Sequence, residues 1–370
     1  MKFTTNTRPL AEALNLGIVD SNVSNFYKRS ALVQLSANAD TLKINVESSM
    51  ICTEISVKGV GEGEPATAFV DCMLFKKLIH TLESNVTIEF EPNGIRVQSG
   101  SSKFNIGNDF GDAVDASAFS LRAPVLPPED ATFTNIDKSA WKFIKDNQMY
   151  AVSNDFSSRP VYTNVWIGES GDVLTGDFDL SLFTHSNKGN LGATCLLSNT
   201  IINLFNSLPE DAQIAKVGSD YLVKFSKDSY DYITQFTPKY EDSEEVGDYK
   251  ADMIINKMAH PEVTNRVFTG LVTKLLNQAT LLNSSNNTYI KLSVTNDTMH
   301  LEGENVHGQI PLEDEVPAEY SAKFKLDKLK QVISNYGDRY INISPIMAGD
   351  RAVGIVVWNE ELTTMFAGAE

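Results

Sequence analysis

Apolar residues recur at helical spacing in three places along the chain. From Phe75 they fall three or four residues apart, and the same spacing starts again at Ile201 and at Leu329. This spacing gathers apolar side chains on one face of a helix, so it predicts three amphipathic helices. The starting points are 126 and 128 residues apart, which indicates an internal repeat.

Each of these helices is followed by three short segments in which apolar and polar residues alternate. Such alternation predicts half-buried strands, and the tight turns between them predict an antiparallel meander. The predicted strands lie near 86–91, 95–98 and 103–106, near 213–217, 221–225 and 232–236, and near 340–343, 352–358 and 362–366.

A second helix, followed by two or three strands, precedes each helix-and-meander segment. We expect these helices near 8–16, at 137–148 with Asp137 as N-cap, and across 263–278, where four apolar residues are spaced four apart. The sequence therefore predicts an α+β fold of three repeated domains, each with two helices packed on antiparallel sheets. Pro-rich and acidic segments place their boundaries at 1–124, 125–249 and 250–370.

Charge is distributed unevenly over these elements. The chain has 48 acidic and 31 basic residues and a net charge of −17, which taken alone argues against binding nucleic acid. The exposed faces of the predicted helices, however, are basic or neutral. They form either ordinary solvated faces or a surface that contacts phosphates without reading sequence. The residues predicted to face DNA from these helices are Lys76, Lys77, Lys142, Lys145, Arg266, Lys274 and Lys330.

Catalytic signatures are weak in this sequence. The five histidines are scattered, and neither a phosphate-binding loop nor a nucleophile elbow is present. Asp172, Asp177 and Asp179 could suggest a cation site, but acidic loop residues are usually only solvated. We therefore predict no catalytic residue, no metal and no cofactor. Two alternatives stay open, a metal-dependent nucleic-acid enzyme and a structural scaffold that does not bind DNA.

The cysteines and the hydropathy concern the cellular compartment. Three widely separated cysteines indicate a reducing environment without a disulfide framework. No apolar run approaches the roughly 18 residues that span a bilayer. We expect a cytoplasmic protein with no membrane partner.

Four segments, at 97–106, 159–165, 238–240 and 278–282, resemble motifs of bacterial β-type DNA polymerase sliding clamps. The second, for example, reads Arg-Pro-Val-Tyr-Thr-Asn-Val, similar to the family's "RPVLxGV". The resemblance implies a non-enzymatic, head-to-tail homodimer. Its ring would encircle double-stranded DNA and tether a DNA polymerase, in a bacterial or phage-infected bacterial cell.

The resemblance also implies two protein-binding sites. Phe104 and Ile106 of one copy would meet Leu281 and Leu282 of the other, although these four could equally belong to internal cores. Short apolar-aromatic motifs of the polymerase and the clamp loader would enter a pocket. The positions that match that pocket are Tyr162, Leu180, Leu182, Pro238, Met365 and Phe366.

The chain departs from the family at this pocket. The family's "TDGHRLA" reads Asp-Phe-Asp-Leu-Ser-Leu-Phe at 177–183, and the basic chain end of the family is replaced by Met-Phe-Ala-Gly-Ala-Glu at 365–370. These departures favour a divergent or phage-encoded member.

Overall fold

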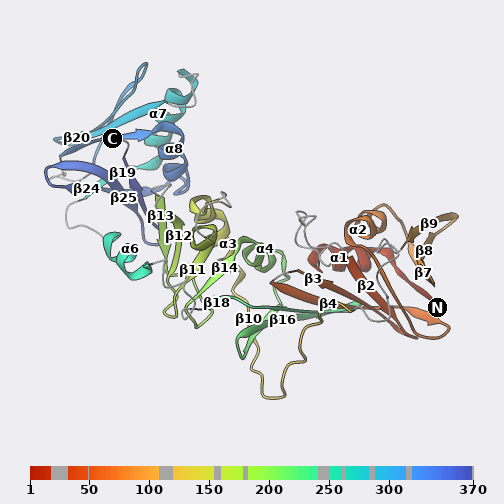
Figure 1. The fold of residues 1–370 in the computed structure, drawn as a ribbon. Coiled ribbons are helices and arrows are strands. Elements are labelled where there is room, and N and C mark those ends of the chain that lie inside the picture. The colour runs from red at the N-terminus through yellow and green to blue at the C-terminus, as the bar shows by residue number, and fades with distance from the viewer. Residues whose placement is uncertain are drawn as a thin grey trace. The chain divides into compact units, whose positions relative to one another are not determined.

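The computed structural model describes residues 1–17, 32–48, 50–107, 120–153, 160–177, 182–240, 250–259, 264–282, 288–313 and 319–368. These residues group into two compact units. Unit 1 comprises residues 1–138 and 200–238, and unit 2 comprises residues 139–199 and 239–370. Figure 1 shows the elements of both units, coloured along the chain.

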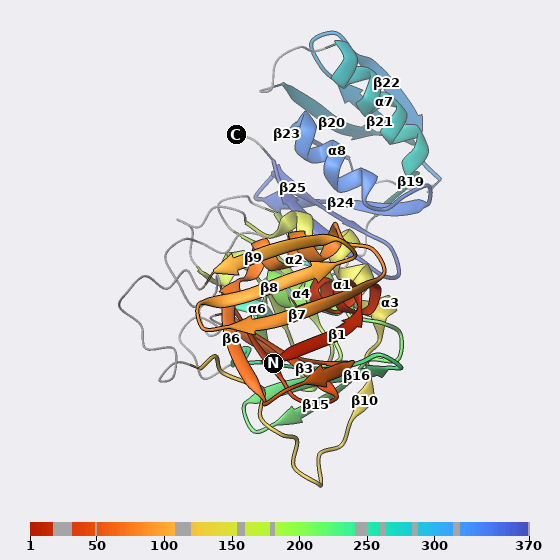
Figure 2. The same cartoon turned by 90° about the vertical axis from the view of Figure 1, so that its right-hand side faces the viewer.

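Unit 1 contains two antiparallel sheets. In the five-stranded sheet β9 is an edge strand, as Figure 2 shows, and Gly100 with φ 58° forms the tight turn that leads into it. The strand order is β5 (Val60–Glu62), β1 (Lys2–Asn6), β7 (Asn85–Glu91), β8 (Gly94–Ser99) and β9 (Ser102–Gly107).

The second sheet of unit 1 has eight strands. Their order is β10 (Thr134–Asn135), β15 (Gln213–Val217), β16 (Asp220–Lys227), β17 (Tyr230–Phe236), β4 (Ile51–Lys58), β3 (Thr41–Glu47), β2 (Leu32–Ala37) and β6 (Ala66–Asp71). Two helices of this unit, α1 (Thr7–Gly17) and α2 (Cys72–His80), pack against each other, and α4 (Asn199–Ser207) leads into β15. Asp71 starts α2 because its side chain accepts a hydrogen bond from the backbone N–H of Leu74.

Unit 2 repeats this plan with a nine-stranded and a four-stranded sheet. The first has the order β18 (Lys239–Tyr240), β14 (Cys195–Ser198), β11 (Asn164–Ile167), β12 (Val173–Asp177), β13 (Leu182–Ser186), β26 (Thr363–Ala367), β25 (Arg351–Trp358), β24 (Tyr340–Ala348) and β19 (Asn265–Phe268). The second has the order β22 (His307–Pro311), β21 (Thr298–Glu302), β20 (Tyr289–Thr295) and β23 (Tyr320–Lys325).

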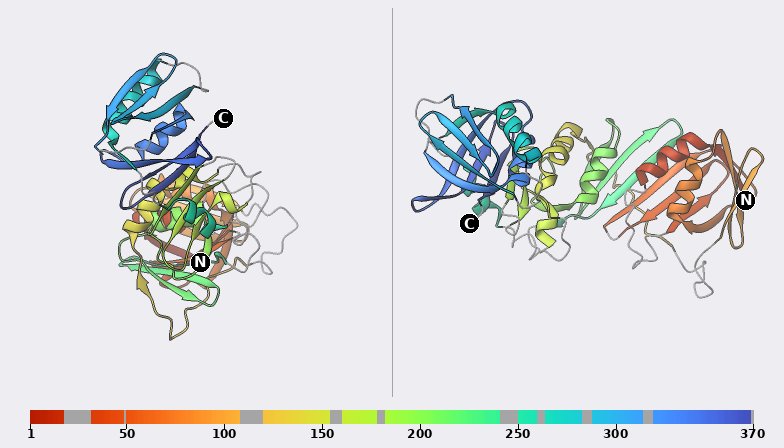
Figure 3. Two further views of the ribbon diagram at one scale, coloured as in Figure 1. Left: turned by 90° about the vertical axis from the view of Figure 1, so that its left-hand side faces the viewer. Right: turned by 90° about the horizontal axis from the view of Figure 1, so that it is seen from above.

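The longer helices of unit 2 pack on these sheets. Helices α7 (Thr269–Leu282) and α8 (Leu326–Ser334) lie side by side, as two further views show in Figure 3. Helix α3 (Lys138–Asn147) is followed by the 3-10 turns η1 (Met149–Ala151) and η2 (Pro160–Thr163). A short helix, α6 (Ala251–Lys257), lies on the face of the nine-stranded sheet opposite α3 (Figure 1).

The predicted helix-and-meander segments are confirmed in all three places. They are α2 with β7–β9, α4 with β15–β17, and α8 with β24–β26. The three-domain boundaries stay a prediction. Strands from two predicted domains join in the eight-stranded sheet and again in the nine-stranded sheet, so the compact units cut across those boundaries.

One helix start was predicted wrongly. Helix α7 begins at Thr269 rather than near 263, and Arg266 and Val267 lie in β19, paired with β24. Val267 is fully buried while Arg266 is exposed, which is the alternation of a strand. The spacing of four is therefore accidental at Val267, and Val263 lies outside the described residues.

Candidate nucleic-acid surface, subunit edges and partner-binding face

The helices carry a charge opposite to that of the chain as a whole. Helices α2, α3, α4, α7 and α8 together contain eight lysines and two aspartates, whereas acidic residues outnumber basic ones by 48 to 31 in the full sequence. In α1, Arg8 and Glu12 form an ion pair with each other. The basic helix faces predicted from the sequence are therefore present on folded helices.

Six of the seven residues predicted to face DNA lie on these helices. Lys77, Lys142, Lys145 and Lys274 are exposed, and Lys76 and Lys330 are half-buried. No carboxylate of the described residues lies within ion-pair distance of the four exposed lysines. Burial lowers the pKa of Lys76, which marks it as the most desolvated of the group.

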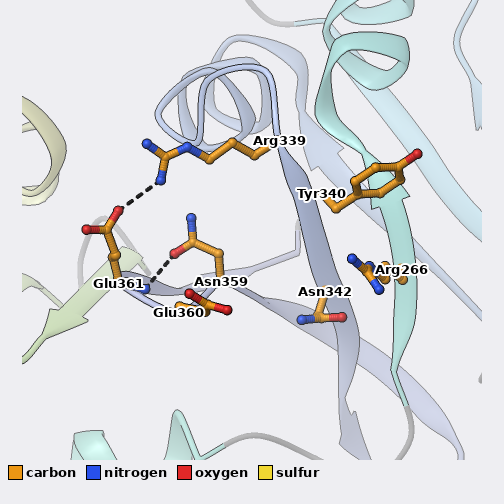
Figure 4. Close-up of a pocket in the computed structure, with 7 residues that line it drawn as sticks. All are labelled: Arg266, Arg339, Tyr340, Asn342, Asn359, Glu360 and Glu361. Atoms are coloured by element: carbon orange, nitrogen blue, oxygen red, sulfur yellow. Dashed lines mark hydrogen bonds and ion pairs between the residues drawn. The ribbon is translucent and has the colours of Figure 1, made fainter.

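The seventh residue, Arg266, lies away from these helix faces, in β19. Figure 4 shows it beside Tyr340 in a hollow of about 410 Å³, and its guanidinium lies 5.0 Å from the centre of that ring. In the same hollow Arg339 donates to Glu361 at 2.9 Å, which lowers the pKa of that carboxyl. Both arginines have carboxylate partners, since Arg266 Nε is 3.8 Å from Glu313, so this hollow is a poor phosphate site.

Two strand pairings inside the chain have the same construction. In the first junction β17 pairs with β4, and in the second junction β26 pairs with β13. Each joins the last strand of a meander to the third strand after the first helix of the preceding predicted domain. Buried threonines oppose one another in both, Thr53 with Thr234 and Thr184 with Thr364.

The strands that correspond to these partners at the chain's two ends are unpaired edges. β9 is the last strand of the first meander and an edge of the five-stranded sheet. β22 is the third strand after α7 in the last predicted domain and an edge of the four-stranded sheet. The described residues thus contain two complete junctions and the two separate halves of a third.

The side chains at these edges match the halves of a junction. In the first junction the Tyr232 hydroxyl reaches the carbonyl of Leu16, near the end of α1. Phe104 holds the same place in β9 that Tyr232 holds in β17, two residues beyond the hairpin's closing pair. Tyr232 is 2 % exposed, but Phe104 is 38 % exposed. Within the described part of the chain, Phe104 is therefore much less covered than its counterpart in the first junction.

The predicted interface residues differ in their exposure. Leu281 and Leu282, at the end of α7, are 85 % and 58 % exposed, so neither belongs to an internal core. The side chain of Ile106 is only 4 % exposed because it points into the core beside Ile95. For Ile106 only the backbone at the strand edge is available to another chain, which corrects the expectation of a side-chain contact.

The predicted pocket residues that the structure describes in unit 2 lie in two different clusters. Met365 and Phe366 are consecutive in β26 and therefore point to opposite faces of the sheet. Phe366 and Leu182 belong to the core that α7 and α8 cover, where Phe366 stacks on Phe324. Met365 packs on the other face, in the cluster that contains Tyr162. Leu180 lies outside the described residues, and Pro238 is buried in unit 1.

The face that carries Met365 is apolar and already covered. We call the side chains of Trp166, Leu174, Phe183, Leu196 and Met365 the Trp166 face. Ala251, Ile254, Ile255 and Met258 of α6 pack on it, together with Tyr162. Neither the other four residues of this face nor α6 was predicted from the sequence. The apolar run of α6 was the available signal, but it is too short to stand out.

Potential metal ligands are dispersed over the described residues. No group of three or more His, Cys, Asp or Glu among them is arranged to hold a metal. His185 Nε2 lies 2.7 Å from Asp172. Burial alone would raise the pKa of Asp172, but hydrogen bonds from Ser170 and His185 outweigh it and lower the pKa. The side chains of Asp177 and Asp179 lie outside the described residues.

The three cysteines, Cys52, Cys72 and Cys195, are buried and free. No helix in the described part of the chain is both long and apolar enough to cross a membrane.

The fold is that of the bacterial sliding clamps. No family model and no curated protein matches the sequence. Among solved structures, a DNA polymerase III beta subunit from Eubacterium rectale has a TM-score of 0.79 at 13 % identity and covers 100 % of both chains. The DNA polymerase sliding clamp from Bacillus subtilis has a TM-score of 0.76 at 15 % identity, covering 100 % of this chain and 99 % of its own.

A beta sliding clamp from Caulobacter crescentus is similar too, with a TM-score of 0.77 at 13 % identity over 100 % of this chain and 99 % of its own. The likeness therefore runs the full length of the chain, although few residues are identical.

Proposed function

We propose that this protein is a DNA sliding clamp, a processivity factor that encircles duplex DNA and tethers a polymerase to it. The observation that carries the proposal is the pair of open edges. Two complete junctions lie within the chain, and β9 and β22 are the two halves of one more. The full-length likeness to bacterial sliding clamps supports the same conclusion.

The open halves define how copies assemble. β9 of one copy pairs with β22 of the next, which is a head-to-tail contact, and such contacts close into a ring when the rotation permits. Two copies of three domains give a ring with two junctions of this kind. An uncovered edge strand is an aggregation hazard, so closure also protects the protein.

Helix α7 stands beside β22 in the way that α1 stands beside β4. A Cβ on Gly308 of β22 would meet Leu275 of α7 at 2.3 Å, and one on Gly17 of α1 would meet Ile55 of β4 at 2.6 Å. We infer that the exposed end of α7, with Leu281 and Leu282, takes the part that the end of α1, with Leu16, has in the first junction. Phe104 of a second copy packs there.

The helix surfaces supply the DNA contact. Lysines scattered over several helices attract phosphates without reading bases, and weak contacts of this kind permit sliding. The acidic remainder of the chain repels DNA. No chemical step is needed, because a closed ring keeps the effective concentration of polymerase at the primer end high.

The polymerase and the clamp loader dock through short apolar-aromatic peptides. The Trp166 face is the surface of unit 2 that suits them, since it combines two aromatic and three aliphatic side chains. Such a protein works in the cytoplasm of a bacterium or of a phage-infected bacterium, in agreement with its free cysteines.

The test combines solution mass with topology on DNA. Light scattering should give twice the 40.8 kDa of one chain. Protein loaded on nicked circular DNA should remain through gel filtration and should be lost when the circle is linearised. A monomer, or equal retention on both DNA forms, would contradict the proposal.

A further inference from the structure

Helix α6 occupies the surface that we assign to partner peptides. Its inward side chains Ile254 and Met258 are 1 % and 2 % exposed, and Ile255 packs on the same cluster. Figure 1 shows α6 against the strands β11 to β13. A peptide that binds the Trp166 face must therefore take the place of this helix.

The corresponding face of unit 1 shows what is unusual here. Strand register matches Gln34 to Trp166, and Gln235 to Met365. At the unit 1 positions the residues are polar, and an extended connector crosses them. It is tied down by the backbone N–H groups of Leu121, which donates to Gln34, and of Val125, which donates to Gln235.

In the described part of unit 2, apolar packing takes the place of these hydrogen bonds. Among the residues that the structure describes, the hydrogen bonds of 250–259 stay within that segment, and no ion pair joins α6 to the sheet. The helix has seven residues. Its N-cap residue is Lys250, which has a φ of 49° and makes no capping hydrogen bond with its side chain. So short a helix has little stability of its own. It owes its order to the face it covers.

A groove gives access to this contact from one side. It has a volume of about 770 Å³ and runs along the start of α6, where Trp166 and Ala251 both line it. A peptide side chain can enter there and reach the edge of the apolar cluster before the helix has left.

We propose that α6 is a built-in occupant of the Trp166 face, displaced when an apolar-aromatic peptide of a replication partner binds. The inference rests on the proposed docking role of this face. Since the helix and the peptide use the same apolar contacts, they exclude each other. The apparent affinity for a peptide falls by the fraction of molecules in which the face is free, so occupancy near 90 % weakens binding about tenfold.

The experiment measures binding of a fluorescein-labelled peptide, Gly-Ser-Leu-Gly-Leu-Phe, by fluorescence polarisation to the full chain. Ile254→Asp removes the main anchor of α6. Asn256→Asp adds the same charge to the same helix at an exposed position and serves as the matched control. We expect Ile254→Asp to bind the peptide at least tenfold more tightly than the unaltered chain, and Asn256→Asp to bind like the unaltered chain.

A second substitution locates the site. Met365→Asp added to Ile254→Asp should abolish the gain, because it places a carboxylate on the Trp166 face. Equal binding by the unaltered chain and Ile254→Asp would overturn the proposal, and so would a complete lack of binding by both.

If Ile254→Asp does not fold, hydrogen exchange on the unaltered chain decides. Saturating peptide should speed exchange at the amides of Ile254 and Met258, and unchanged exchange would overturn the proposal. Retention on circular DNA is measured separately, so failure here is distinguishable from failure of the clamp assignment.

Discussion

Replacing Leu281 by Ser should break the ring, and the size of the effect follows from its exposure. Burying a whole leucine side chain stabilises by about 1.5–3 kcal/mol. Leu281 is 85 % exposed in the single chain, so its burial in a junction contributes about 2 kcal/mol. A closed dimer contains two such junctions, which must open together for the copies to separate. The loss is then about 4 kcal/mol, or about a thousandfold in the dimer dissociation constant.

The assay is sedimentation velocity over a dilution series, with Leu126→Ser as the matched control. Leu126 is 89 % exposed but lies on the connector between β9 and β10 and belongs to neither edge strand. The Leu126→Ser substitution should leave the dimer dissociation constant unchanged. If Leu281→Ser raises the dimer dissociation constant only about thirtyfold, the copies are joined by a single contact in an open dimer. No loss, or an equal loss in the control, would refute the assignment of this edge.

Two further predictions concern charge. The first concerns Lys77→Ala and Lys142→Ala, tested by the salt dependence of DNA binding by the dimer. Each substitution should lower the slope of log K against log salt by about 0.9 for every phosphate contact removed. An unchanged slope would exclude these lysines from the DNA surface. Asp172→Asn should destabilise unit 2 at pH 7, where the lowered pKa of Asp172 keeps the carboxylate ionised beside His185. That stabilisation is present above the ordinary pKa of 3.8 and disappears as the pH falls through the lower pKa that Asp172 has in the folded state. The free energies of unfolding of the unaltered chain and of Asp172→Asn, measured in urea, should therefore converge in acid.

The elements that the sequence predicted well are those set by local periodicity. The apolar positions of α2, α4 and α8 repeat every three or four residues, and each helix buries the stripe so defined. Their meanders have hairpin turns that leave little freedom of pairing. For such elements a stretch of ten residues already contains most of the information that fixes the conformation.

The errors arose where distant segments decide the outcome. Arg266 and Val267 fit a helix by spacing, yet pairing with β24 makes them a strand. Met365 and Phe366 were both expected in one pocket from the family resemblance, whereas the pleat sends them to different cores. Which face of a strand is covered, and by what, depends on segments far away in the sequence. Helix α6, for example, starts 85 residues after Trp166 and meets it only in the folded sheet. No local pattern contains that information.

The contrast between the two connectors yields a last prediction, which concerns Gln235. Its side-chain oxygen accepts the Val125 N–H at 2.8 Å, and its amide donates to Asp220 at 2.6 Å. Gln235→Met installs the residue found at the matching place in unit 2 and removes both bonds. A hydrogen bond of this kind contributes about 0.5–1.5 kcal/mol, so the Val125 amide should exchange about 2 to 13 times faster.

Hydrogen exchange read by NMR supplies its own control in this case. The Leu121 N–H donates to Gln34, which the substitution leaves in place, so its exchange should change less. Unaltered exchange at Val125 would show that packing, rather than the glutamine, holds the connector. The polar and apolar connectors would then be held in the same way, and the reason for treating α6 as displaceable would be weakened. A faster Val125 amide with a steady Leu121 amide would instead establish that each unit secures its connector by different chemistry.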